Sequence, residues 1–348
     1  MSDPVVTDKY MMNGNKMLHH LDRVEAWRRG DHIAPIHIDA GLSKGSSTPK
    51  SSKKYFPRDA LLQFVRDCGD LGVRSMALIG EAEPLLNPHA YEAIIEGEKA
   101  GVDMSMGTHG ILLDTGSTGE EALENLTWIR FNVNAATQKD YARINGSNDF
   151  DLAIEKIKFC VSIKKKKNLP LTVGLQMALT PNNACQVIPL VTLGKELNVD
   201  YTVISQSGDT SADRFDNEQQ LTDILKEAEA QSRNDYNVIV KWDKILNESK
   251  RNYDQCLGAP FLLHTSGDGK LYTCANFFDG EKEEAYRLGD LVKQSFKELI
   301  ESEHYWSVID KVYNCINVHK ECNSHCRTNS INDFLWEYKD VPDHVDFI

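Results

Sequence analysis

The chain has 348 residues, of which 41% are hydrophobic and 26% charged, so it is long enough for a large domain plus a smaller one. Its net charge of −13 argues against a general affinity for nucleic acid or for anionic membranes. No apolar run approaches the ~20 residues of a membrane span. The first residues lack the basic and apolar regions of a secretory signal, so we expect a soluble, cytoplasmic protein with reduced cysteines.

Apolar segments with strand character alternate with amphipathic segments along most of the chain. Apolar residues at helical spacing between Met17 and Trp27 predict a first helix, which ends at Gly30. Strands are expected at residues 33–40, 73–79, 102–106, 128–134, 171–179, 199–205 and, for a shorter one, 238–240. Helices are expected from residue 57 and at residues 89–100, 120–126, 149–165, 183–197 and 218–232.

This alternation predicts an α/β fold with parallel strands and crossover helices. Six main strands, with no Gly-x-Gly-x-x-Gly turn after the first, favour a partial (β/α)6 barrel of TIM type over a doubly wound sheet. The predicted domains are a helical lead-in at 1–31, the barrel at 32–245 and a small Cys-rich α+β domain at 250–348.

Polar residues follow each of the six strands, where ligands bind in a barrel of this kind. Together these polar residues predict a ligand pocket. The set consists of the Ser/Lys-rich loop 41–54, the turn 80–84, Thr108, His109, Asn132, Asn134, Gln176, Ser205 and Gln206.

Five of the eight cysteines lie in the last third of the chain, from Cys256 to Cys326. Gly267, Gly269 and the alternating residues after them predict a tight turn into a strand that delivers Cys274. Four thiolates gathered from separate elements make a metal or iron–sulfur site. Buried free cysteines are the alternative interpretation.

The predicted barrel, the turn Gly80-Glu-Ala-Glu-Pro84 and the Cys-rich end together resemble the radical SAM superfamily with a C-terminal SPASM/twitch-type domain. The turn is similar to the family's Gly-Gly-Glu-Pro motif, which holds the amino group of S-adenosylmethionine. The resemblance implies a one-electron radical transformation of a small-molecule or peptide substrate, with an electron-donor protein as partner. It implies cofactor contacts at Gly80, Glu81, Ala82, Glu83, Thr108, Asn132 and Gln176, and substrate contacts at Arg130, Asn132, Gln176 and Gln206.

One departure from the family concerns the loop after the first strand, where the family carries Cys-x3-Cys-x2-Cys. Ser46, Lys50 and Lys53 reproduce that spacing here, and neither residue type is a soft ligand at neutral pH. We therefore expect no catalytic cluster in this chain. The loop is either a Ser-rich replacement of the lost motif or, through its four lysines, an attractor of anionic substrates.

For an auxiliary [4Fe–4S] cluster of the SPASM/twitch type we assign Cys256, Cys274, Cys322 and Cys326 as ligands. Cys315 is the reserve, because its helix could leave it buried and inert. Zinc is the competing metal, since four cysteines also satisfy a tetrahedral ion. Two functions stay open: a radical SAM oxidoreductase or isomerase, and a degenerate relative that keeps the fold as a binding or partner protein.

Overall fold

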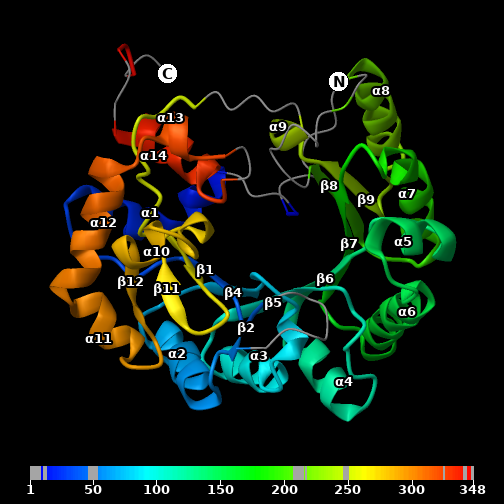
Figure 1. Ribbon diagram of the computed structural model, residues 1–348, viewed down its shortest axis with the longest axis horizontal. Helices are drawn as coiled ribbons and strands as arrows, with labels where there is room; N and C mark the ends of the chain where they lie inside the picture. The colour runs from blue at the N-terminus through cyan, green and yellow to red at the C-terminus, as the bar shows by residue number, and fades with distance from the viewer. Residues whose placement is uncertain are drawn as a thin grey trace. The chain divides into compact units, whose positions relative to one another are not determined.

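The computed structural model describes residues 9–10, 14–45, 54–206, 215, 218–245, 251–323, 326–339 and 343–345. It confirms an α/β fold whose strands are mostly parallel (Figure 1). The chain divides into two compact units, unit 1 (Met1–Met11 and Met104–Glu248) and unit 2 (Met12–Asp103 and Ser249–Ile348). These units differ from the predicted domains 1–31, 32–245 and 250–348. The predicted domain boundaries therefore stay a prediction.

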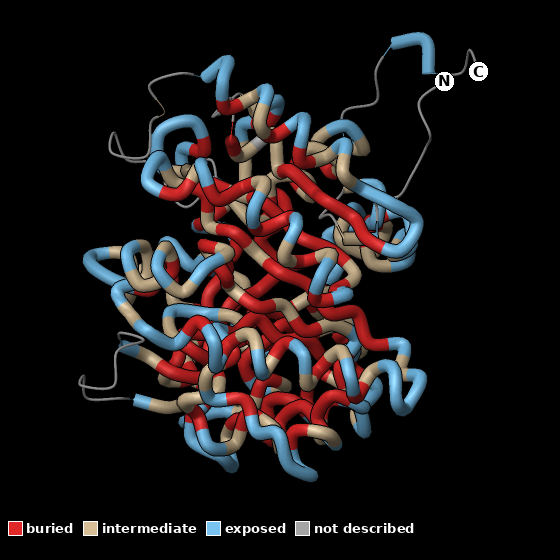
Figure 2. Tube along the Cα trace, turned by 90° about the vertical axis from the view of Figure 1, so that its right-hand side faces the viewer, coloured by how far each residue is buried: buried red, intermediate tan, exposed pale blue. Residues whose placement is uncertain are grey.

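Unit 1 contains a parallel sheet in which each strand pairs with the next one along the chain. The strands are β5 (Asp103–Thr108, whose first residue belongs to unit 2), β6 (Leu126–Asn132), β7 (Thr172–Leu179), β8 (Tyr201–Gln206) and β9 (Asn237–Val240). The helices are α4 (Ser117–Glu124), α5 (Gln138–Asn145), α6 (Phe150–Lys167), α7 (Val187–Glu196, after the 3₁₀ turn η3, Ala184–Gln186), α8 (Glu218–Glu229) and α9 (Trp242–Ile245). Buried residues concentrate in the strands, as expected when helices cover a parallel sheet (Figure 2).

Unit 2 contains a mixed sheet in the order β12-β11-β10-β1-β4, in which β1 is parallel to both of its neighbours. The strands are β1 (His37–Ala40), β4 (Ser75–Leu78), β10 (Leu262–Thr265), β11 (Lys270–Tyr272) and β12 (Arg287–Asp290), with β2 (Ser43–Lys44) and β3 (Lys54–Tyr55) pairing separately. The helices are η1 (Gly14–His20), α1 (Leu21–Arg28), α2 (Arg58–Asp70), η2 (Pro84–Leu86), α3 (Ala90–Lys99), η5 (Ala275–Phe277), α10 (Lys282–Ala285), α11 (Phe296–Glu301), α12 (Glu303–Cys315), α13 (Val318–Glu321) and α14 (Asn329–Lys339).

The observed elements follow the predicted alternation, and two of the differences have a clear physical cause. The first strand begins at His37 rather than at residue 33, beyond Pro35, which has no backbone N–H to donate to a ladder. Helix α5 was absent from the prediction although its end signals are in the sequence. The Thr137 side chain accepts a hydrogen bond from the Asp140 N–H, and Gly146 ends the helix at φ 67°.

One apolar cluster in unit 2 joins the beginning and the end of the chain. Met17 and Val24 of the first helical segment pack with Leu257, Phe261 and the Leu335 side chain of α14. Leu257 adjoins Cys256, so this cluster holds the first cysteine of the candidate site against the last helix.

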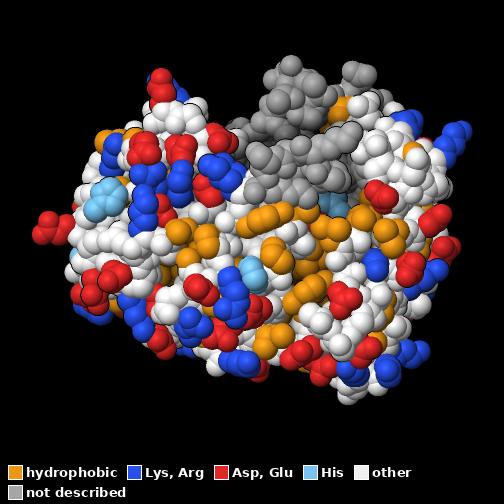
Figure 3. Space-filling model, turned by 60° about the horizontal axis from the view of Figure 1, so that its bottom comes forward, with side chains coloured by type: hydrophobic (Ala, Val, Ile, Leu, Met, Phe, Trp, Pro, Cys, Tyr) orange, Lys and Arg blue, Asp and Glu red, His pale blue; other side chains and the backbone are white. Residues whose placement is uncertain are grey.

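The surface carries both signs of charge. On the face that Figure 3 shows, Lys and Arg side chains are interspersed with Asp and Glu side chains. None of the helices in the described part of the chain is both long and apolar enough to cross a bilayer.

Candidate metal centre

The four cysteines assigned as ligands lie in unit 2, on four separate segments. Cys256 precedes β10, Cys274 follows β11, Cys322 ends α13 and Cys326 lies shortly before α14. The hairpin that delivers Cys274 is therefore observed as predicted, with Gly269 at φ 85° in its turn.

The four thiols interact electrostatically with one another. Burial raises the pKa of Cys256 and of Cys274 to about 12, and the neighbouring Cys326 thiolate adds to both shifts. Burial and Cys326 also raise the pKa of Cys322. In each case burial and the charge of a neighbouring thiolate oppose ionisation, so the protein alone keeps Cys256, Cys274 and Cys322 as neutral thiols at pH 7. A bound cation reverses that preference, because metal ligation requires thiolates.

Two buried polar side chains of the tail contact these sulfurs. The Thr328 Oγ1 atom lies 3.3 Å from Cys326 Sγ and 3.8 Å from Cys256 Sγ. Asn332 Nδ2 lies 3.8 Å from Cys256 Sγ. Among the described residues, no group of three or more His, Cys, Asp or Glu side chains is placed to hold a single metal ion.

The remaining cysteines differ in exposure. Cys315 lies at the last turn of α12 and is exposed, whereas the same helix buries Val308, Ile309 and Val312. The reason given for holding Cys315 in reserve, that its helix could bury it, is therefore wrong, and its role as a ligand stays a prediction. Cys68 and Cys160 are buried.

A buried ion pair joins the cysteine-bearing tail to the first strand. Arg327 donates from Nε to Asp39 Oδ2 at 2.6 Å and from Nη2 to Asp39 Oδ1 at 2.7 Å. Burial alone would raise the pKa of Asp39, but Arg327, with His37 and His264, holds that pKa well below its usual range. Arg327 directly follows Cys326, so the pair fixes the backbone next to a predicted ligand.

Two histidines complete the polar cluster around Asp39. His37 Nε2 lies 3.0 Å from Asp39 Oδ1, and because a carboxylate only accepts, this nitrogen carries the proton. His37 Nδ1 lies 2.7 Å from Ser75 Oγ on the neighbouring strand β4. His264 pairs in register with Asp39 across β1 and β10, and burial lowers its pKa to about 4 although Asp39 opposes the shift.

The turn predicted to contact S-adenosylmethionine packs against the hairpin of Cys274. A Cβ atom on Gly80 would lie 2.5 Å from the Gly41 Cα, and one on Gly267 would lie 1.9 Å from the Ser43 carbonyl carbon. Only glycine permits these backbone approaches. They place the Glu81 carboxylate where it accepts the Gly267 N–H at 2.9 Å.

The carboxylates of this turn have different surroundings. Burial raises the pKa of Glu81, against the opposing effects of the Gly267 N–H and of Lys44, whose Nζ lies 3.8 Å from Glu81 Oε1. Glu83 is buried and accepts from the Leu85 N–H at 3.3 Å, which caps η2. Ser46, Lys50 and Lys53 of the loop after β1 lie outside the described residues.

The other predicted cofactor contacts belong to unit 1. Asn132 and Gln176 are register partners at the carboxyl ends of β6 and β7, so their side chains share one face of the sheet. Thr108 pairs with Phe131, which puts its side chain on the opposite face, where its hydroxyl accepts the Gly110 N–H at 2.9 Å. The structure thus brings two of these three residues together.

A polar cavity of about 470 Å³ lies in unit 1 beyond the ends of β6 and β7. Arg143 of α5 is its cationic group, with Nη1 donating to the Asn182 carbonyl at 3.2 Å and Nη2 to the Asp140 carboxylate at 3.2 Å. The cavity is lined by Asn134, Arg143, Ile144, Asn145, Ala178, Thr180, Asn182 and Asn183. Asn134 was predicted to face a pocket; Arg143 was missed with helix α5.

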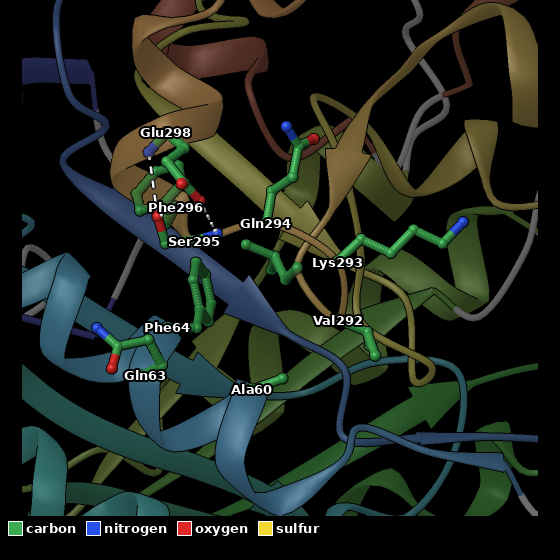
Figure 4. A pocket seen from close by; sticks show the side chains of 10 residues that line it. Ala60, Gln63, Phe64, Val292, Lys293, Gln294, Ser295, Phe296 and Glu298 are labelled. Carbon is green, nitrogen blue, oxygen red and sulfur yellow. Dashed lines mark hydrogen bonds between the residues drawn. The ribbon is translucent and has the colours of Figure 1, made fainter.

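A smaller cavity of about 240 Å³ lies in unit 2 between α2 and the segment that leads into α11 (Figure 4). Ser295 and Glu298 bond each other there as a helix cap, and the Phe296 N–H donates to the buried Asp67 carboxylate at 2.9 Å. None of the predicted site residues lines this cavity.

Comparisons with known proteins support the resemblance deduced from the sequence. No protein-family model matches the chain. It is 26% identical over 254 residues to a GTP 3',8-cyclase of Campylobacter fetus subsp. fetus (strain 82-40), a match that covers 68% of this chain and 75% of the cyclase.

Solved structures show the same fold at lower identity. SuiB of Streptococcus suis bound to S-adenosylmethionine superimposes with a TM-score of 0.62 at 13% identity, covering 86% of this chain and 74% of SuiB. Native anSMEcpe with bound AdoMet gives a TM-score of 0.53 at 16% identity, covering 86% and 88%. The chain shares the fold of these two proteins. Together with the cyclase match, this supports the predicted likeness to the radical SAM superfamily.

Replacing Asp39 with Asn should destabilise unit 2. The change leaves the Arg327 guanidinium beside a neutral amide. Breaking a buried ion pair costs about 3–5 kcal/mol of the free energy of unfolding, and because the Arg327 side chain is 30% exposed we expect the lower figure, about 3 kcal/mol. Urea unfolding measures it. Lys293→Ala is the control, because it removes only the exposed pair with Asp290 and should leave the free energy of unfolding unchanged. Equal values for both variants would contradict the role given to Asp39.

His264→Gln should flatten the dependence of stability on pH. The native state keeps His264 neutral down to about pH 4, whereas the unfolded chain protonates it near pH 6.5, so the unfolded state binds more protons in this window. The free energy of unfolding of the original protein should fall by about 3 kcal/mol more than that of the variant as pH drops from 6.5 to 4. His319→Gln, at an exposed histidine, should retain the original profile. Parallel profiles for the His264 variant and the original protein would disprove the assignment.

Proposed function

We propose that this chain is an iron–sulfur protein of the radical SAM type. In this proposal it has the partial TIM-like barrel and SPASM/twitch-like end of that superfamily, and Cys256, Cys274, Cys322 and Cys326 hold a single auxiliary [4Fe–4S] cluster. The observation that carries the proposal is that four separate segments of unit 2 deliver these cysteines and that Thr328 contacts two of the sulfurs, those of Cys326 and Cys256.

The residues present fit the auxiliary cluster. All four predicted ligands are soft donors, and the Thr328 hydroxyl contacts two of them, Cys326 Sγ at 3.3 Å and Cys256 Sγ at 3.8 Å. A bound cluster would supply one-electron transfer there. Ligation would also remove the cost of ionising thiols that repel one another. The protein's part is to hold the sulfurs, exclude water and supply hydrogen-bond donors to them.

The residues present do not fit the catalytic cluster of the superfamily. Residues 41–54 contain no cysteine, and the positions with the right spacing are Ser46, Lys50 and Lys53. A lysine ammonium cannot ligate iron, and serine rarely ionises. We therefore derive no radical step for this chain and propose that it acts as a binding or partner protein.

We propose the unit 1 cavity for the carboxylate of S-adenosylmethionine, whereas the amino-group contact expected at the turn 80–84 stays a prediction. The cavity of about 470 Å³ is within the usual range for small-ligand sites and is lined by carboxamides and one guanidinium. Arg143 would pair with the ligand's carboxylate, and Asn134 or Asn145 would bond its polar groups. The bound ligands of SuiB and anSMEcpe support this choice of molecule.

A second candidate is the family role itself, a one-electron transformation of a substrate by an active radical SAM enzyme. The adjacent Asn132 and Gln176 at the strand ends favour it, because they keep a polar face beside the cavity. It requires iron at the loop after β1, so counting iron separates the two candidates.

Anaerobic reconstitution should load about four irons and four sulfides per chain, the content of one cubane. Cys274→Ser should lose most of that iron, whereas Cys315→Ser, at the exposed cysteine, should keep it. With dithionite and S-adenosylmethionine the protein should form no 5′-deoxyadenosine. About eight irons, or deoxyadenosine at catalytic rates, would establish the active enzyme instead; bound zinc without iron would contradict the cluster.

Arg143→Gln should weaken the binding of S-adenosylmethionine about tenfold or more, because it removes a charge-assisted contact of about 1.5–3 kcal/mol. Isothermal titration calorimetry gives both affinities. Arg66→Gln is the matched control, since it removes an exposed arginine that pairs with Glu96 in unit 2. Equal affinities for the two variants would exclude the unit 1 cavity as the cofactor site.

A further inference from the structure

Thr328 and Asn332 form a buried polar pair beside the sulfurs of Cys256 and Cys326. Their exposed fractions are 5% and 1%, so neither side chain relies on solvent for hydrogen bonds. They lie one helical turn apart at the start of α14, where the Asn332 N–H donates to the Thr328 carbonyl at 2.8 Å. This spacing lets one helix end bring a hydroxyl and an amide to two predicted ligands.

The backbone of Gly258 fixes which way the Asn332 amide points. The Gly258 N–H donates to Asn332 Oδ1 at 2.6 Å, so the oxygen faces the backbone and Nδ2 faces the sulfurs. Nδ2 then has one hydrogen toward Cys256 Sγ at 3.8 Å and another toward Thr328 Oγ1 at 3.5 Å.

The same network directs the Thr328 hydroxyl. Oγ1 accepts from Asn332 Nδ2, and the nearer sulfur is Cys326 Sγ at 3.3 Å. Once Cys326 is a thiolate ligand it has no proton to give, so the Thr328 hydroxyl is the donor of that contact. Both donors therefore point at sulfur. A neutral thiol needs no such donors, whereas a thiolate ligand only accepts hydrogen bonds.

The close approach of these groups favours a glycine at position 258. A Cβ atom there would lie 3.1 Å from Asn332 Oδ1, from Ile331 Cγ2 and from Thr328 Cβ. Gly258 thus lets the backbone after Cys256 pack directly on the start of α14, which keeps the donors near both sulfurs.

We propose that Thr328 and Asn332 are positioning residues of the tail centre, which direct hydrogen bonds to the Cys326 and Cys256 ligands and thereby set the reduction potential of the cluster. Hydrogen bonds to ligand sulfurs stabilise the added negative charge of the reduced state, and they are one of the means by which proteins tune such clusters. This inference rests on the proposed function, since it needs a redox-active centre at these cysteines.

The test compares Thr328→Val with Thr328→Ser in the full chain after anaerobic reconstitution. Valine keeps the shape and removes the hydroxyl; serine keeps the hydroxyl. Thr192→Val is the matched control, because it removes a helical threonine hydroxyl in unit 1. Iron content and the midpoint potential from a redox titration are measured for each.

We expect Thr328→Val to favour the oxidised state about tenfold, a fall of about 59 mV in potential for one electron. Thr328→Ser and Thr192→Val should keep the original potential. Loss of iron from the valine variant with retention in the serine variant also supports the hydroxyl's role. Iron retained at an unchanged potential in the valine variant would overturn this inference alone, as would loss of iron from both variants. An original protein without iron would overturn the proposed function and this inference together.

Discussion

The bidentate ion pair between Asp39 and Arg327 is the contact on which the candidate centre depends. It links a carboxylate inside the first strand to the residue after Cys326, across 288 positions of sequence. A buried carboxylate is costly unless a cation and further donors satisfy it, and here Arg327 and His37 do so. The chain can therefore bury Asp39 only when its last segment has returned to the first strand, and this return brings Cys326 to the other thiols.

The thiols themselves add a second constraint. Burial, together with the charge that a neighbouring Cys326 thiolate would carry, raises the pKa of Cys256, Cys274 and Cys322, so these three thiols stay protonated in the protein alone. Binding a cation exchanges those protons for metal–sulfur bonds, so the affinity of the site should depend on pH. Thr328 and Asn332 already point donors at two of the sulfurs, an arrangement that suits thiolates better than thiols.

The alternation of strands and helices was predictable from the sequence, because strands that are buried on both faces of a parallel sheet consist of near-continuous apolar residues. The hairpin of Cys274 was also predictable, since its glycines mark the turn. The partners of the cysteines were not predictable in the same way. Asp39 and Arg327, like Gly258 and Asn332, are far apart in sequence, and no local period connects residues that meet through the fold.

Other differences have local causes. Helix α5 was missed because it contains few apolar residues and buries only Tyr141, although Thr137 and Gly146 mark its ends. Cys315 was placed in a helix correctly, but its position at the last turn exposes it. Arg143 was missed with α5, and with it the cationic group of the unit 1 cavity.

The central claim is that iron binds at the tail cysteines and nowhere near the loop after β1. Anomalous diffraction at the iron edge, from crystals of the reconstituted protein, tests it most directly. The account predicts one iron centre within bonding distance of Cys256, Cys274, Cys322 and Cys326. Iron beside Ser46 or Lys50, or no iron at the four cysteines, would contradict it.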